Sequence, residues 1–184
     1  MTLTPSNMMP LGSIAPDFNL LDTISNTHKS LQQLRGEKGT LVMFICNHCP
    51  YVKHVDDALV QLGEDYQDSD LAIIAISAND VATYPQDGPA EMTRKATTLG
   101  YSFPYLYDES QATARAYQAA CTPDLFLFDE NLACVYRGQF DDSRPGNGVP
   151  VTGIDLRTAI DCLLAAETVS QAQKPSMGCN IKWK

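Results

Sequence analysis

The sequence has little of what would direct a chain to a membrane or to nucleic acid. No apolar run approaches the ~20 residues that a membrane-spanning helix needs. Only 13 basic residues stand against 22 acidic ones, which gives a formal net charge of −9. Since no basic cluster is present, nucleic acid and anionic membranes are poor candidates as partners.

Signals for secretion are missing as well. The first ten residues have neither a basic segment nor a long apolar stretch, so we expect a cytoplasmic protein. In a reducing compartment, the six cysteines are more typical of thiols, metal ligands or redox groups than of structural disulfides. There is also no internal repeat. The 184 residues are therefore expected to form a single domain over 1–184, with a lead-in over 1–15 and a tail over 171–184.

Hydrophobic patterning predicts strands that alternate with helices. Buried parallel strands are predicted over 41–45 and 71–77, a short strand over 105–107, and hairpins over 18–21 with 27–29 and 125–128 with 133–136. Helices are predicted over 51–66, 91–99, 111–118 and 155–166, with Ser30 as the N-cap of a short turn. The segment 78–89 is expected to be a loop at the sheet edge where the strands end, which is where open α/β sheets bind ligands.

Two cysteines lie where the strand 41–45 gives way to the helix 51–66, in the segment Cys46-Asn47-His48-Cys49-Pro50. The first amide groups of a helix present unpaired donors and a partial positive charge. Such positions lower the pKa of a cysteine from about 8.5 to roughly 3.5–7.5. Pro50 fits this position, because proline is favoured in the first helical turn.

A strand, a Cys-x-x-Cys segment and a helix in this order resemble the active site of the thioredoxin superfamily. The segment 11–18 is similar to the Gly-x-x-Ala-Pro-Asp-Phe opening of its redoxin branch, which holds TlpA-type thiol oxidoreductases and alkyl hydroperoxide reductases. The segment 121–138 resembles that branch's Thr-Pro loop and closing hairpin, and 178–184 resembles a bacterial subgroup of thioredoxin-family proteins. The resemblance implies an α/β, thioredoxin-like fold with a mixed central sheet and helices on both faces.

The Cys46–Cys49 pair predicts a thiol–disulfide oxidoreductase acting on protein or small-molecule disulfides. Cys46 is expected to be an exposed attacking thiolate and Cys49 a more buried resolving thiol, because exchange needs one sulfur to form the mixed disulfide and another to release it. His48 is expected to donate to the Cys46 sulfur and stabilise its thiolate. No organic cofactor is expected, since the dithiol itself carries two electrons. The electron-donor reductase is left unassigned.

The resemblance further implies that Pro123 is a cis-proline opposite the cysteine pair. The backbone of Thr122 would then pair with a bound peptide as an added strand. Cys121, next to this loop, is either a third redox thiol or a packing residue. Cys179 in the tail is either a second resolving thiol or part of a segment that Trp183 anchors.

Departures from the thioredoxin pattern leave one role open. The buried aspartate that thioredoxins carry six residues before the first cysteine is replaced by Thr40, and the aromatic residue before that cysteine by Ile45. Proton transfer at Cys49 therefore has no assigned group. Cys134 and Cys162 are expected to be packing residues.

Two rival functions remain. A peroxiredoxin-like peroxidase would use Cys49, but the Pro and Thr of the motif Pro-x-x-x-Thr/Ser-x-x-Cys are replaced by Val42 and Cys46. Arg115 and Arg137 are the candidates for its arginine. The second rival is a metal-binding or redox-sensing module that uses the two cysteines with His48 or His54, although a zinc site usually shows a second Cys/His pair and none is evident.

Overall fold

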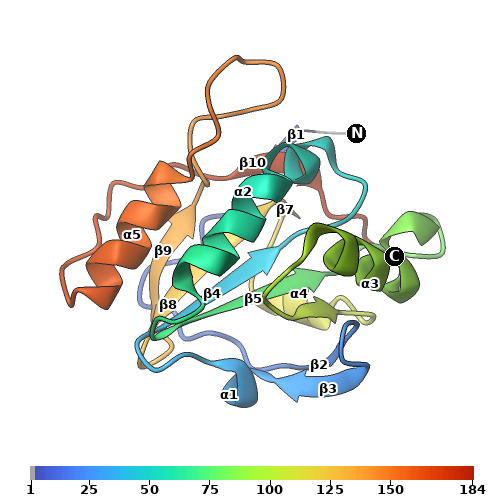
Figure 1. Cartoon of the computed structure of the whole chain (residues 1–184), viewed down its shortest axis with the longest axis horizontal. Coiled ribbons are helices and arrows are strands. Elements are labelled where there is room, and N and C mark those ends of the chain that lie inside the picture. Colours follow the sequence, from blue (N-terminus) through green and yellow to red (C-terminus); the bar gives the residue numbers. More distant parts are fainter. Residues whose placement is uncertain (1–2) are drawn as a thin grey trace.

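The computed structural model describes residues 3–184 and has an α/β architecture (Figure 1). Its strands are β1 Leu3–Pro5, β2 Asn19–Asp22, β3 Thr27–Ser30, β4 Gly39–Phe44, β5 Leu71–Ser77, β6 Tyr105–Tyr107, β7 Cys121–Thr122, β8 Asp124–Asp129, β9 Cys134–Gly138 and β10 Met177–Asn180. Its helices are α1 Leu31–Leu34, α2 Pro50–Tyr66, the short 3-10 helix η1 Pro85–Asp87, α3 Pro89–Leu99, α4 Ala112–Ala116 and α5 Ile154–Leu164. Among these described residues, no helix is long and apolar enough to cross a membrane.

The main sheet is mixed, with the strand order β3-β2-β6-β5-β4-β8-β9. The central strand β4 runs parallel to β5 and antiparallel to β8. All six residues of β4 are buried. A strand covered on both faces favours a continuous apolar run over alternation, which is why 41–45 was recognisable in the sequence.

Helices cover both faces of this sheet, as the resemblance implied (Figure 1). Successive side chains of a strand point to opposite faces. Leu41 and Met43 therefore pack in a core cluster with residues of α2, α3 and α5, whereas Val42 and Phe44 pack in a second cluster with residues of α1 and α4.

Most predicted elements are confirmed to within a few residues. Ser30 caps α1 through a capping box, in which its hydroxyl accepts from the Gln33 amide and the Gln33 side chain accepts from the Ser30 amide. The helix α4 spans only Ala112–Ala116 and is therefore shorter than the helix predicted over 111–118.

Parts of the predicted lead-in and of the predicted tail form strands, which the hydrophobic pattern did not predict. β1 pairs with β10, and β10 pairs with β7, so both segments belong to a small antiparallel sheet of order β1-β10-β7. Residues 1–2 of the lead-in lie outside the described part of the chain. Figure 1 shows this small sheet at one end of α2, the helix that follows the cysteine pair.

Candidate redox site

The predicted site residues come together where β4 ends and α2 begins. Cys49 is the N-cap of α2 and Pro50 is its first residue. The Cys46 Sγ lies 3.4 Å from the Thr122 Oγ1, and the Cys49 Sγ lies 3.2 Å from the Thr122 carbonyl oxygen. The Thr122–Pro123 peptide bond is cis, as the resemblance implied. The loop between β7 and β8 therefore lies directly against the Cys-x-x-Cys segment.

Cys49 is the sulfur that this environment favours as a thiolate. Its pKa is lowered to about 4, chiefly by a hydrogen bond from Cys46 and, against the opposing effect of burial, by contacts with Cys179, Thr122 and the Val52 amide. The Val52 amide belongs to the first turn of α2, where backbone donors are unpaired. The start of the helix contributes to this shift, but its amide is a smaller cause than the hydrogen bond from Cys46, and the shift falls on the second cysteine of the pair.

The prediction of an exposed Cys46 thiolate is wrong. Cys46 is 1% exposed and Cys49 is fully buried. The pKa of Cys46 is raised well above its ordinary value, first by its hydrogen bond to Cys49, then by burial and by the negative charge of Asp87. In the reduced protein, Cys46 is thus the thiol that donates and Cys49 the thiolate that accepts.

Asp87 is a site residue that the sequence did not reveal. It is fully buried at the end of η1, within the segment that was predicted only as a loop. Its Oδ1 accepts from the backbone amides of Asn47 at 2.8 Å and His48 at 3.2 Å. Its Oδ2 lies 2.6 Å from the His48 Nδ1 and accepts from the Asn79 Nδ2 at 2.8 Å. One carboxylate thus holds the turn between the two cysteines.

His48 does not make the predicted hydrogen bond to Cys46. Its Nδ1 faces Asp87, and its ring stacks on Tyr84 with the centroids 5.1 Å apart. Within the described part of the chain, its Nε2 is buried without a hydrogen-bond partner. The contact with Asp87 turns the imidazole away from the role that sequence spacing predicted.

The proposed metal ligands do not form a site of the predicted composition. Ligand atoms of Cys46, His48 and Asp87 lie within 4.8 Å of one another. Both Asp87 oxygens are already held by the surrounding groups, including the His48 ring itself, so this cluster fits a hydrogen-bonded turn better than a cation site. His54 pairs with the Ser143 hydroxyl at 2.6 Å instead.

The substrate edge predicted at Thr122 is occupied by the protein's own chain. In β10, Cys179 pairs opposite Thr122 and Asn180 opposite Cys121. The Sγ atoms of Cys179 and Cys49 are 2.7 Å apart. Glycine is required at position 178, because a Cβ there would lie 2.1 Å from the Thr122 carbonyl oxygen. An incoming peptide would have to displace β10 before it could pair with Thr122.

The other cysteines differ in their surroundings. Cys121 is buried, and burial raises its pKa far above the ordinary range; its sulfur contacts the Pro123 carbonyl oxygen at 3.5 Å. Cys134 is buried in β9, as expected for a packing residue. Cys162 is only half-buried on α5.

Neither the arginine of peroxiredoxins nor the buried aspartate of thioredoxins has a counterpart among the residues considered for these roles. Arg115 lies over the Trp183 ring, 4.4 Å from its centroid. Arg137 donates to the Met9 carbonyl oxygen and to Gln173. The Thr40 hydroxyl accepts from the Gly36 amide at 3.2 Å. Proton transfer between the cysteines themselves is therefore the simplest chemistry that the site supports.

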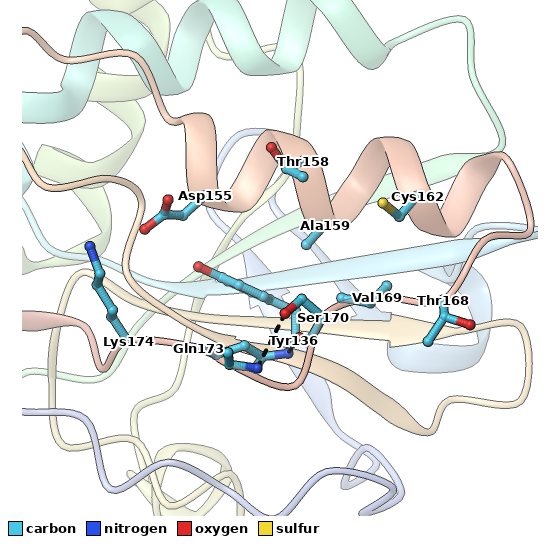
Figure 2. Close-up of a pocket in the computed structure, with 11 residues that line it drawn as sticks. Tyr136, Asp155, Thr158, Ala159, Cys162, Thr168, Val169, Ser170, Gln173 and Lys174 are labelled. Carbon is cyan, nitrogen blue, oxygen red and sulfur yellow. Dashed lines mark hydrogen bonds between the residues drawn. The ribbon is translucent and has the colours of Figure 1, made fainter.

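Two surface hollows differ in their relation to the cysteines. One, of about 520 Å³, is lined by Asn47 and His48 together with residues of α2 and α3. The other, of about 300 Å³, lies between α5, β9 and the segment 168–174, and Figure 2 shows Tyr136, Cys162 and Lys174 around it. No predicted catalytic residue lines the second hollow, so only the first is relevant to the site.

Asp124, the first residue of β8, is a buried carboxyl group beside the Thr122–Pro123 loop. Burial raises its pKa to about 6, although the Ala120 amide, Ser6 and other donors oppose this shift. Its Oδ1 has no hydrogen-bond partner among the described residues. Because the folded protein holds this proton more tightly than the unfolded chain, the stabilisation is complete below the ordinary pKa of 3.8 and is lost as the pH rises through 6.

We therefore expect Asp124→Asn to weaken the pH dependence of stability. The difference between the two pKa values corresponds to about 3 kcal/mol. Urea unfolding at about pH 4 and about pH 7 should show that the free energy of unfolding of the wild type falls by that much more than that of the variant. Equal pH dependence in the two proteins would contradict the assignment.

Comparison with known proteins places these features in a family. The chain is similar to an uncharacterized conserved protein from Geobacillus kaustophilus, with 53% identity, a TM-score of 0.98, and coverage of 100% of this chain and 97% of that chain. It is also similar to a hypothetical protein from Sinorhizobium meliloti, with 45% identity, a TM-score of 0.96 and coverage of 98% of both chains.

More distant similarity shows the fold. The thioredoxin domain of a thiol-disulfide oxidoreductase from Bacteroides vulgatus has 18% identity and a TM-score of 0.65, with coverage of 85% of this chain and 99% of that chain. Among the curated proteins, no sequence matches this one. The AhpC/TSA family matches residues 11–137, which is more than half of the sequence. The chain therefore belongs to the AhpC/TSA family, and its fold is thioredoxin-like.

Proposed function

We propose that the protein is a thiol–disulfide oxidoreductase in which Cys46 and Cys49 alternate between a dithiol and a disulfide. The observation that carries this proposal is the hydrogen-bonded pair itself, in which one sulfur is stabilised as a thiolate at the start of α2. Thiolates attack disulfides, and a second adjacent thiol resolves the mixed disulfide. The substrates are disulfides of proteins or of small thiol compounds.

Cys46 is the sulfur that attacks the substrate. Because the pair favours the thiolate on Cys49, the attacking species is the minor form in which the shared proton has moved to Cys49 and Cys46 carries the charge. The Cys46 proton moves along the existing hydrogen bond to Cys49, and Cys46 attacks one substrate sulfur. The substrate S–S bond breaks, a Cys46–substrate disulfide forms, and the leaving thiolate takes the proton from Cys49. Cys49 then attacks the Cys46 sulfur, which releases the second substrate thiolate and leaves the Cys46–Cys49 disulfide.

The substrate approaches from the hollow beside Asn47 and His48. The turn at this end of the site is fixed by Asp87, which binds the amides of both residues. Lys95 forms a partly buried ion pair with Asp56 at 2.8 Å along the same hollow, and its Nζ also lies 3.4 Å from the Cys46 carbonyl oxygen. The attacking cysteine is therefore held on a rigid turn, as positional catalysis requires.

The experiment that tests this function is reduction of an insulin-type disulfide substrate, with dithiothreitol as the electron donor. The wild type should accelerate the reaction, and Cys46→Ser should abolish the acceleration. Cys162→Ser is the matched control, because Cys162 lies half-buried on α5 and lines only the remote hollow. Full activity in Cys46→Ser would rule out the proposed mechanism.

One observation favours a second candidate, a thiol peroxidase. Cys49, the residue that aligns with the peroxidatic cysteine of peroxiredoxins, is the one whose pKa is lowered to about 4. If peroxide is the substrate, its consumption should be lost in Cys49→Ser and retained in Cys46→Ser. Loss of peroxide consumption in both variants, together with disulfide reduction by the wild type, would favour the oxidoreductase.

A further inference from the structure

We propose that β10 is a built-in substrate strand and that Cys179 is a third redox sulfur, which exchanges with the Cys46–Cys49 disulfide to give a Cys49–Cys179 disulfide. This inference rests on the proposed function, because it needs the disulfide that the first half-reaction produces. It decides between the two roles that the sequence left open for Cys179, and it assigns a role to the strand that carries this cysteine.

The first argument is the position of β10 on the backbone. The resemblance to the redoxin branch implies that the backbone of Thr122, the residue before the cis-proline, pairs with an added strand, and such pairing is a general mode of peptide binding. Here Cys179 occupies that register opposite Thr122. The pairing continues beyond the strand, where the Ile181 amide donates to the Ala120 carbonyl oxygen at 3.1 Å. The chain thus presents its own cysteine where a substrate cysteine would lie.

The second argument is the position of the sulfur atoms. The Cys49 Sγ contacts the Cys179 Sγ at 2.7 Å and is also hydrogen-bonded to Cys46. Cys49 therefore lies between two sulfurs and can form a disulfide with either. All three cysteines are buried. Exchange between Cys49 and Cys179 would move the disulfide from the Cys46–Cys49 pair to β10.

The third argument is that β10 is tied to the turn that carries the site. The Lys182 amide donates to the Asn79 Oδ1 at 2.8 Å, while the Asn79 Nδ2 donates to Asp87. The Gln111 Nε2 donates to the Lys182 carbonyl oxygen at 2.8 Å and so fixes the strand from the other side. Asn79 thus connects the segment after Cys179 to the carboxylate that orients Asn47 and His48.

The exchange step balances without a further reagent. Cys179 loses its proton to solvent and attacks the Cys49 Sγ of the Cys46–Cys49 disulfide. The Cys46–Cys49 bond breaks, the Cys49–Cys179 bond forms, and the electron pair leaves on the Cys46 sulfur, which takes up a proton. The substrate disulfide is the oxidant for the whole cycle, and an external dithiol finally reduces the Cys49–Cys179 disulfide.

The test is disulfide mapping by mass spectrometry after equilibration of the full chain with mixtures of reduced and oxidised glutathione. The wild type should form both the Cys46–Cys49 and the Cys49–Cys179 disulfides, and Cys46→Ser should form the Cys49–Cys179 disulfide alone. Cys179→Ser should form only the Cys46–Cys49 disulfide. Cys162→Ser, as the matched control, should give the wild-type map.

The outcomes separate this inference from the proposed function. If the wild type forms the Cys46–Cys49 disulfide but neither it nor Cys46→Ser ever forms the Cys49–Cys179 disulfide, the inference is overturned and the proposed function stands. If no disulfide forms at Cys49 in any of the proteins, both are overturned.

Discussion

Replacing Cys49 with serine is expected to lower the rate of disulfide reduction by about 10²- to 10⁴-fold, the usual contribution of a positioned acid or base. The variant loses both the thiolate that accepts the Cys46 proton and the sulfur that resolves the mixed disulfide. Cys46 retains its position against Thr122 and still attacks slowly. A stable Cys46–substrate disulfide should therefore accumulate.

The measurement is mass spectrometry of Cys49→Ser after exposure to glutathione disulfide, with peptide mapping of the modified cysteine. Ultraviolet absorbance should show a thiolate that titrates at about pH 4 in the wild type and is missing in the variant. Cys162→Ser should accumulate no mixed disulfide and should keep the thiolate. If instead Cys46→Ser traps the substrate on Cys49, the attacking and resolving roles are the reverse of those proposed.

Substitution of Asp87 by asparagine is expected to lower the free energy of unfolding by about 3–5 kcal/mol, the usual cost of removing one partner from a buried charged interaction. Asp87 accepts hydrogen bonds from the backbone amides of Asn47 and His48 at one oxygen and from the Asn79 side chain at the other. The side-chain NH₂ group of an asparagine would face one of these sets of donors and could not accept from it. Urea unfolding measures this loss. Asp80→Asn, at a half-buried carboxylate of the same segment that accepts from the Ala82 amide and the Thr83 hydroxyl, should cost less.

A second readout separates the electrostatic role of Asp87 from a purely structural one. Because the negative charge of Asp87 raises the pKa of Cys46, Asp87→Asn should shift the pH profile of Cys46 alkylation to lower pH. Asp80→Asn should leave that profile in place. An unchanged profile in folded Asp87→Asn would mean that the carboxylate positions the turn without influencing the thiol.

The fold and the central part of the site could be predicted because their signals are local or motif-based. Apolar runs identify β4 and β5, and the resemblance of the Thr-Pro loop to the redoxin branch implied the cis bond at Pro123. The cysteine pair followed from its spacing between a strand and a helix. The strands and the spacing of the cysteine pair depend on neighbouring residues, whereas the cis bond was implied by the resemblance alone.

Other parts of the site depend on contacts between distant segments. Asp87 reaches His48 across 39 positions, and Cys179 reaches Cys49 across 130. No periodicity predicts such pairs, and β10 contains glycine and polar residues that do not suggest a strand. The thiolate was predicted on Cys46 because spacing does not show which way the hydrogen bond between the two cysteines runs, and the further contacts of Cys49 with Cys179 and Thr122 come from distant segments.

The division into two sheets has a consequence for how the protein opens. Native proteins open in cooperative units, and units with few contacts open at lower free energy than the whole molecule. The strands β1, β10 and β7 form a separate three-stranded sheet, whereas β4 is buried and lies between β5 and β8 in the main sheet. Amide hydrogens of β10 should therefore exchange with solvent sooner than those of β4. Such sub-global opening would let a substrate reach the buried sulfurs while the main sheet stays folded.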